Sequence, residues 1–260
     1  MVDKLLSDPL RSYDELKKQP DGKIADHVVK HDSLFQPDDI YYVGDSKYYK
    51  SSTVYSSKAI YKQHTYAKNI IQYNVNLEIE SSGSLPELRY RDPLTEGYNF
   101  TPNFFVEAFI PKSHVPSSDQ ALIFDTAALP RLNRHFENRL FDRDTLATLS
   151  FKLSFPFALR AYLSNDAKGR QRFRNSALQE IRKSVRQYLN DNFDFFRIRP
   201  HASVKIFVEK HFYLLTGKIY QTSEMRGEVI LALAKDRRPD AARILELLTP
   251  EADLLAFSPL

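Results

Sequence analysis

An apolar run at residues 40–43 leads directly into Gly44-Asp45-Ser46-Lys47, and this junction limits the possible folds most strongly. The run is rich in aromatic and β-branched residues, which predicts a buried strand. Residues two apart in a strand point to the same face of the sheet. Asp45 and Lys47 should therefore lie side by side, so the fold has to accommodate a carboxylate and an ammonium group at the end of a buried strand.

A second strand-like run at residues 23–30 precedes this one, and a polar loop at residues 31–39 separates them. The loop contains Pro37-Asp38, which is typical of a turn, so the two runs predict an antiparallel hairpin. With the turn centred near residues 36–37, Asp26 should lie roughly opposite residues 46–48. The Pro37-Asp38 pair itself should lie in the turn, at the far end of the hairpin from Asp45.

The hairpin brings together residues that suit magnesium chemistry. The chain has no cysteine, which excludes disulfides and thiolate metal sites but leaves oxygen ligands available. Carboxylates are hard ligands for Mg²⁺, and Asp26 supplies the second carboxylate that Asp45 needs. Lys47 could orient or deprotonate an attacking water and stabilise charge on a phosphate. We therefore expect Asp26 and Asp45 to bind the metal and Lys47 to act beside them.

A helix is expected from Ser56 or Ser57 to about Tyr73, and it carries Lys62-Gln63-His64-Thr65-Tyr66. Gln63 is a further candidate catalytic residue, since its side chain could contact the attacking water or a phosphate. Lys62 and His64 fit an ordinary exposed helix surface better. The alternative for the whole group is that Asp-x-Lys is a common triplet, and that the two side chains form an ordinary ion pair on an exposed strand.

The rest of the chain alternates strand-like and helical segments and predicts an α/β protein. Residues 1–130 should form the core and residues 131–260 a mainly helical region packed on it. The expected elements are a helix at 4–18, a long loop at 81–103, strands at 103–111 and 121–125, a helix at 175–189, a strand at 203–208 and two C-terminal helices.

The formal net charge is +4, and positive charge is concentrated between residues 168 and 186. Arg170, Arg172 and Arg174 alternate with other residues in what reads as a loop entering a helix. These three are the candidate DNA contacts, because each could neutralise a backbone phosphate. The alternative is a solvated helix face. The sequence has no P-loop, no G-x-G-x-x-G and no G-x-S-x-G motif.

Three stretches resemble a known family. Gly44-Asp45-Ser46-Lys47-Tyr48-Tyr49, Lys62-Gln63-His64-Thr65-Tyr66 and residues 135–145 are similar to the LlaJI-type, McrC-related restriction endonucleases of the PD-(D/E)XK nuclease superfamily. The resemblance covers about residues 20–190. It implies a restriction-endonuclease-like core with a mixed sheet flanked by helices, Mg²⁺-dependent cleavage of DNA and an AAA+ GTPase partner of the McrB type. By this resemblance Asp26 and Asp45 are metal ligands, Lys47 is the catalytic lysine, and Gln63 occupies the assisting helix position.

The chain departs from this family pattern at its N-terminus. Family members usually carry a longer region there, with a helix whose Glu contributes to the metal site. Asp14 and Glu15 are the nearest substitutes, and the expectation is a nuclease core truncated at its N-terminus. The alternative function is a non-catalytic DNA-binding or assembly subunit that keeps the nuclease fold. The sequence has neither a secretion signal nor an apolar run that could span a membrane, so a cytoplasmic location is expected.

Overall fold

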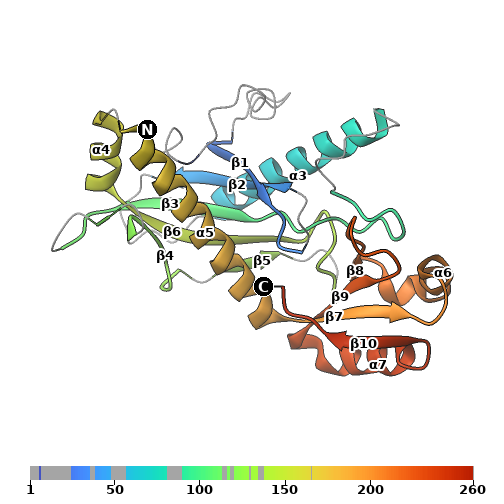
Figure 1. Ribbon diagram of the computed structural model, residues 1–260. Coiled ribbons are helices and arrows are strands. Elements are labelled where there is room, and N and C mark those ends of the chain that lie inside the picture. The colour runs from blue at the N-terminus through green and yellow to red at the C-terminus, as the bar shows by residue number, and fades with distance from the viewer. Residues whose placement is uncertain are drawn as a thin grey trace.

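A six-stranded sheet with mixed strand directions lies at the centre of the protein (Figure 1). The computed structural model describes residue 6 and residues 25–35, 39–47, 57–80, 90–112, 116–117, 120–128, 130–133, 138–164 and 166–259. The strand order is β1-β2-β3-β6-β4, and β5 also pairs with β6. Strands β2, β3 and β6 are mutually parallel, and the other pairings are antiparallel. The expectation of an α/β fold with a mixed sheet is confirmed. The strands are β1 (His27–Asp32), β2 (Asp39–Lys47), β3 (Asn103–Phe109), β4 (Leu122–Phe124), β5 (Arg131–Asn133) and β6 (Leu146–Ser154).

Two long helices, α3 (Ser57–Glu80) and α5 (Ala167–Asn192), cover opposite faces of this sheet (Figure 1). Helix α3 meets the face that carries Asn103, because Gln63 donates to the Asn103 side chain. Helix α5 meets the other face, where Arg182 contacts the Tyr42 hydroxyl. A shorter helix, α4 (Phe155–Leu163), follows β6 directly and precedes α5.

The expected hairpin is confirmed: β1 and β2 pair antiparallel, with His27 opposite Gly44 and Asp32 opposite Asp39. Asp26 stands immediately before β1, and continuing the register places it level with Asp45. The sequence-based estimate had placed it opposite residues 46–48, so the register differs by at least one residue. Residues 36–38, including the Pro37-Asp38 pair, lie outside the described residues.

A second, four-stranded sheet forms the C-terminal part, in the order β10-β7-β9-β8. Its elements are β7 (Phe193–Pro200), α6 (Val204–Leu215), β8 (Ile219–Tyr220), β9 (Val229–Ala234), the 3₁₀ helix η2 (Lys235–Arg237), α7 (Arg238–Leu248) and β10 (Ala252–Ala256). The expected strand at 203–208 is wrong, since these residues begin α6. The Ser203 side chain accepts a hydrogen bond from the Ile206 amide at 3.4 Å and so caps the helix.

The C-terminal half contains more sheet than expected, because β6, β7 and β9 were all read as parts of a mostly helical pattern. Strand β6 lies beyond the expected core boundary at residue 130, yet it pairs with three strands of the main sheet. Residues 168–174 are also helical rather than a loop, since α5 begins at Ala167. Of the expected helix at 4–18, only Leu6 is among the described residues, and it is helical and buried.

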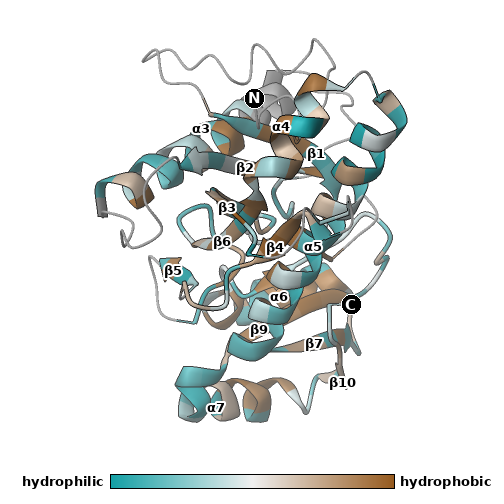
Figure 2. Cartoon of the chain, turned by 90° about the vertical axis from the view of Figure 1, so that its left-hand side faces the viewer, coloured by the Kyte–Doolittle hydropathy of each residue, from teal (hydrophilic) through white to brown (hydrophobic). Residues whose placement is uncertain are grey.

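The apolar side chains gather on the two sheets, as the brown strands in Figure 2 show, while α5 carries a largely hydrophilic outer surface. One cluster of buried residues joins the main sheet, α3, α4 and α5, and a second fills the space under α6 and α7. Among the described residues, none of the helices is both long and apolar enough to cross a membrane.

Gly44 is required by a close approach between β2 and β3. A methyl group at this position would overlap the ring of Phe104, which packs directly over the Gly44 backbone. We predict that Gly44→Ala lowers the free energy of unfolding by about 1–3 kcal/mol, the usual cost of overpacking a core. Chemical denaturation measures this directly. In a double-mutant cycle with Phe104→Leu the two costs should be less than additive, and strict additivity would contradict the proposed clash.

His64 was expected on an exposed helix surface, but it is buried and joins α3 to β6, with Nε2 lying 3.3 Å from the Thr148 hydroxyl. Burial lowers the pKa of His64 to about 4, and Lys68 adds to the effect. Its unfolded-state value is about 6.5, so between these pH values the unfolded chain binds more protons than the folded one. The stabilisation is therefore complete above pH 6.5 and is lost as the pH falls toward 4, by at most about 1.4 kcal/mol per pH unit.

Measuring the free energy of unfolding of wild type and His64→Gln between pH 4 and pH 8 isolates this contribution. Glutamine retains a polar group near Thr148 but does not titrate. The difference between the two proteins should change with pH only below about 6.5. A difference that stays constant over the whole range would show that His64 protonates equally in both states.

Candidate active site

Asp45 and Lys47 lie together at the carboxyl end of β2, and both are buried. The Lys47 Nζ contacts Asp45 Oδ2 directly, and it also lies 5.4 Å from the centre of the Phe105 ring on β3. The alternation of β2 explains this arrangement, because residues 45 and 47 project to the same face. That face is the one covered by α3. The pair is thus not the exposed ion pair that formed the alternative expectation.

Asp26, the residue immediately before β1, lies at the same end of β2. Its Oδ2 accepts a hydrogen bond of 2.9 Å from the backbone amide of Ser46, the residue between Asp45 and Lys47. This bond fixes the Asp26 side chain against the centre of the Asp-x-Lys triplet. The hairpin therefore brings together the three residues that the sequence assigned to the metal and the catalytic lysine.

Gln63 projects from α3 onto the same face and is fully buried. Its Nε2 donates to the Val43 carbonyl at 2.8 Å and to Asn103 Oδ1 at 3.3 Å. Its Oε1 is buried and has no hydrogen-bond partner among the described residues. Gln63 thus connects α3 to both β2 and β3 just before Asp45, and it retains an unused acceptor.

The electrostatic surroundings act on Lys47 in two directions. Burial and the nearby charge of Lys62 lower the pKa of Lys47, while Asp26 acts to raise it. A lysine with a lowered pKa gives up its proton more easily than an exposed one. Lys62, which the sequence assigned to an ordinary exposed surface, therefore lies near enough to influence the site. Its side chain is exposed and its Nζ lies 5.3 Å from the centre of the Tyr66 ring.

Glu107 is a site neighbour that the sequence reasoning missed. It is buried on β3, and the parallel register places it beside Lys47 on one side and Lys152 on the other. Lys152 in turn pairs with Asp125 at 2.8 Å. Charged groups of alternating sign therefore cross the α3 face near this edge of the sheet. A glutamate inside the apolar run Asn103–Phe109 was the signal that could have revealed it.

The opposite face of β2 has different chemistry. His27 Nε2 lies 2.6 Å from the Ser46 hydroxyl, and the His27 ring stacks on Phe104 with centroids 6.2 Å apart. These residues pack under α5 rather than α3. They therefore support the hairpin from behind and do not reach the face that carries Asp45 and Lys47.

The arginines expected to contact DNA are separate from this site. Arg170, Arg172 and Arg174 all lie in the first two turns of α5, on the other side of the sheet from α3. The Arg170 guanidinium donates to the Ser164 carbonyl at 2.6 Å, and that of Arg174 donates to Gln171 Oε1 at 3.1 Å. The structure therefore does not bring the three arginines into contact with the Asp45–Lys47 pair.

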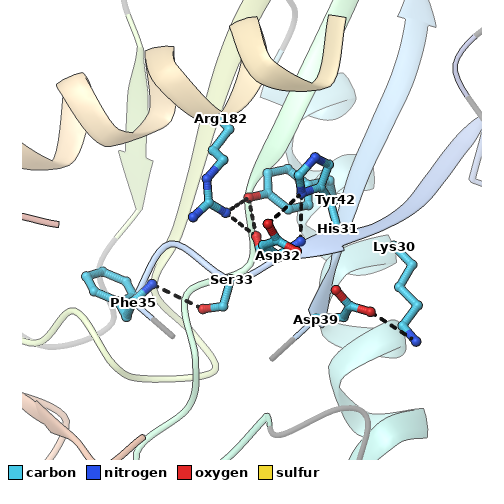
Figure 3. Close-up of polar contacts among 8 residues, drawn as sticks. All are labelled: Lys30, His31, Asp32, Ser33, Phe35, Asp39, Tyr42 and Arg182. Atoms are coloured by element: carbon cyan, nitrogen blue, oxygen red, sulfur yellow. Dashed lines mark hydrogen bonds and ion pairs between the residues drawn. The ribbon is translucent and has the colours of Figure 1, made fainter. Parts of the chain in front are cut away.

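Further along α5, Arg182 has a structural role (Figure 3). Its guanidinium contacts the Asp32 carbonyl and lies 3.4 Å from the Tyr42 hydroxyl, which itself donates to the Asp32 carbonyl at 2.9 Å. Burial raises the pKa of Tyr42 to about 12, although Arg182 acts against this shift. Tyr42 therefore remains protonated at neutral pH, and Arg182 holds α5 to the hairpin instead of facing solvent.

The donor set at the site consists mainly of carboxylates. Among the described residues, no group of three or more His, Asp or Glu side chains is close enough together to hold a metal ion. Mg²⁺ commonly uses one or two carboxylates and completes its coordination with waters and substrate phosphates, so Asp26 and Asp45 fit this ion. Comparisons of the chain with protein-family models, with curated proteins and with solved structures find no match.

Proposed function

We propose that the protein is a Mg²⁺-dependent DNA endonuclease that hydrolyses phosphodiester bonds as a subunit of a restriction system. One observation carries the proposal: Asp45 and Lys47 are buried side by side at the end of β2, with Asp26 bonded to the residue between them. The resemblance to the LlaJI-type nucleases rests on the same residues. A hairpin, then a helix, then a parallel strand also form the kind of mixed α/β core that this resemblance implies.

Each residue has a distinct role in the proposed reaction. Asp26 and Asp45 would hold the magnesium ion, which supplies positive charge beside the scissile phosphate. Lys47 would orient the attacking water and stabilise the negative charge that builds on the phosphate. The free Oε1 of Gln63 would accept a hydrogen bond from water on the same face.

Hydrolysis then requires few further groups. The oxygen of water forms a bond to the scissile phosphorus and gives up a proton, the bond from phosphorus to the leaving sugar oxygen breaks, and that oxygen takes up a proton. Arg170, Arg172 and Arg174 supply positive charge for the DNA backbone at a distance from the reacting atoms. An AAA+ GTPase partner of the McrB type follows from the resemblance and belongs to the proposal on that ground alone.

A second candidate function is a DNA-binding or assembly subunit without catalytic activity. The observation in its favour is that Asp45 is already paired with Lys47, so its negative charge is compensated without any metal. In that case the pair would serve only to hold the end of β2. A cleavage assay distinguishes the two functions, because only the first requires both side chains for hydrolysis.

We predict that Asp45→Asn and Lys47→Ala each reduce Mg²⁺-dependent cleavage of plasmid DNA by about a hundredfold or more while leaving DNA binding intact. Asparagine keeps the shape of the side chain but removes the charge that attracts the metal, so Asp45→Asn should also weaken Mg²⁺ binding. Lys47→Ala leaves both carboxylates in place and should still bind the ion. Cleavage and metal binding are measured separately, with the GTPase partner present where one is found.

The matched control uses an ion pair at the opposite end of the same hairpin. Lys30 and Asp39 lie 3.1 Å apart there and are partly exposed (Figure 3). Lys30→Ala and Asp39→Asn should leave cleavage close to the wild-type rate, since an exposed pair contributes little. Wild-type cleavage by either the Asp45 or the Lys47 variant would exclude Asp-x-Lys as the active site. An inactive wild type that still binds DNA would favour the second function.

A further inference from the structure

Three arginines from two helices converge on a hollow at the junction of α4 and α5. The walls of this α4–α5 hollow include Phe157, Arg160, Ala161, Asp166, Arg170 and Arg172, and its volume is about 260 Å³. A water occupies about 30 Å³ in the liquid, so the hollow holds about nine waters. That space is large enough for a single phosphate with part of its sugar.

The positive charge of the three arginines in the hollow is not compensated by carboxylates of the described residues. Nowhere in the described part of the chain does a carboxylate form an ion pair with Arg160, Arg170 or Arg172, as no pair within 4.0 Å involves them. The only acidic group among the eight residues that line the hollow is Asp166, and it is engaged as the cap of α5. Its Oδ1 accepts the Gly169 amide at 2.8 Å. Three guanidinium groups therefore face one carboxylate that is already used.

The walls are also held in place before any ligand binds. The rings of Phe157 and Phe173 pack with centroids 5.0 Å apart, which fixes α4 against α5. Arg170 donates to the Ser164 carbonyl across the turn between the helices, and Arg160 lies 5.7 Å from the centre of the Phe157 ring. A methyl group at Gly169 would displace the Asp166 carboxylate that caps this turn. Arg170 is therefore positioned before an anion binds, which reduces the side-chain entropy lost on binding, while Arg160 and Arg172 are exposed at the mouth of the hollow.

The hollow lies near the same edge of the main sheet as the candidate active site, although α5 and α3 cover opposite faces of that sheet. Lys47 is level with Glu107 and Lys152 in the parallel strands, and α4 starts directly after β6, three residues beyond Lys152. Helix α4 therefore leaves the sheet from the edge where Asp45 and Lys47 lie. Its nine residues span about 13 Å, which is well within one turn of a DNA duplex, about 34 Å.

We infer that the α4–α5 hollow binds one backbone phosphate of the DNA, using Arg160, Arg170 and Arg172 as its donors. The inference deepens the proposed function and rests on it. It adds Arg160, from α4, to the DNA-binding residues, and it separates Arg172 from Arg174, which is not part of the hollow. The bound phosphate positions the duplex relative to the Asp45–Lys47 edge and carries no information about base sequence.

The test is equilibrium binding of a labelled 30-base-pair duplex without Mg²⁺, so that cleavage does not interfere. Replacing Arg160, Arg170 and Arg172 by Gln should weaken binding about tenfold to a hundredfold for every duplex sequence. The slope of log affinity against log salt should become shallower by about 0.9, the value for one phosphate. A change near 2.7, which corresponds to three phosphates, would contradict a single binding position.

Two comparisons make the test specific. Replacing Arg226, Arg238 and Arg243 by Gln removes the same charge from exposed positions in the C-terminal part, and this variant should bind DNA nearly as wild type does. On α5, Arg172→Gln should weaken binding more than Arg174→Gln. Equal effects of these two would mean that the helix offers a diffuse charged face, which would overturn the inference. Unfolding curves confirm that each variant remains folded.

The outcomes also separate this inference from the proposed function. Loss of binding in the triple variant supports the hollow even if the wild type cleaves nothing. Normal binding by the triple variant rejects it even if the wild type cleaves DNA. Inorganic phosphate and a mononucleotide are tested at equal ionic strength by thermal unfolding. One result would assign the hollow to a small ligand and reject the DNA phosphate. In that result either small anion stabilises the wild type but not the triple variant, while the same substitutions leave duplex binding unchanged.

Discussion

Strand β2 pairs with β1 on one side and with β3 on the other, and every group at the candidate site takes its position from these two pairings. The antiparallel pairing brings Asp26 to the amide of Ser46. The parallel pairing places Phe105 and Glu107 beside Asp45 and Lys47. Parallel strands need a crossover, and here the crossover includes α3, so Gln63 arrives on the same face. The site is therefore a property of the order of the strands in the main sheet.

The burial of Asp45 and Lys47 lowers the stability that the fold could otherwise reach. Removing a carboxylate and an ammonium from water is expensive, and their mutual attraction often only offsets the loss. A pair of apolar residues at the end of β2 would stabilise the core at least as well. The Gln63 Oε1, buried without a partner among the described residues, adds a similar penalty. Polar groups that reduce stability are common at functional sites, and this supports reading the end of β2 as one.

The sequence was sufficient to predict the hairpin and the grouping of Asp26, Asp45 and Lys47, because strand alternation and a turn signal are local properties. The predicted register between β1 and β2 was wrong by at least one residue, because the register of a hairpin depends on the conformation of its loop. Residues 204, 206 and 208 are all apolar and imitate a strand, but Phe207 and His211 complete a buried helical face. Arg160 was missed for another reason: it reaches Arg170 and Arg172 only because two aromatic rings pack α4 against α5.

Helix α5 is a single continuous element of 26 residues, and it makes polar contacts near its start and near its middle. Near its start, at Arg170, it forms part of the α4–α5 hollow. Twelve residues later the guanidinium group of Arg182 contacts the backbone carbonyl of Asp32 in the hairpin. These points are about 18 Å apart along one helix. Between these points a buried face of α5 packs on the main sheet. The hairpin that carries Asp45 is thus joined to the layer on the opposite face of the sheet twice, through the apolar core and through one side-chain contact to its backbone.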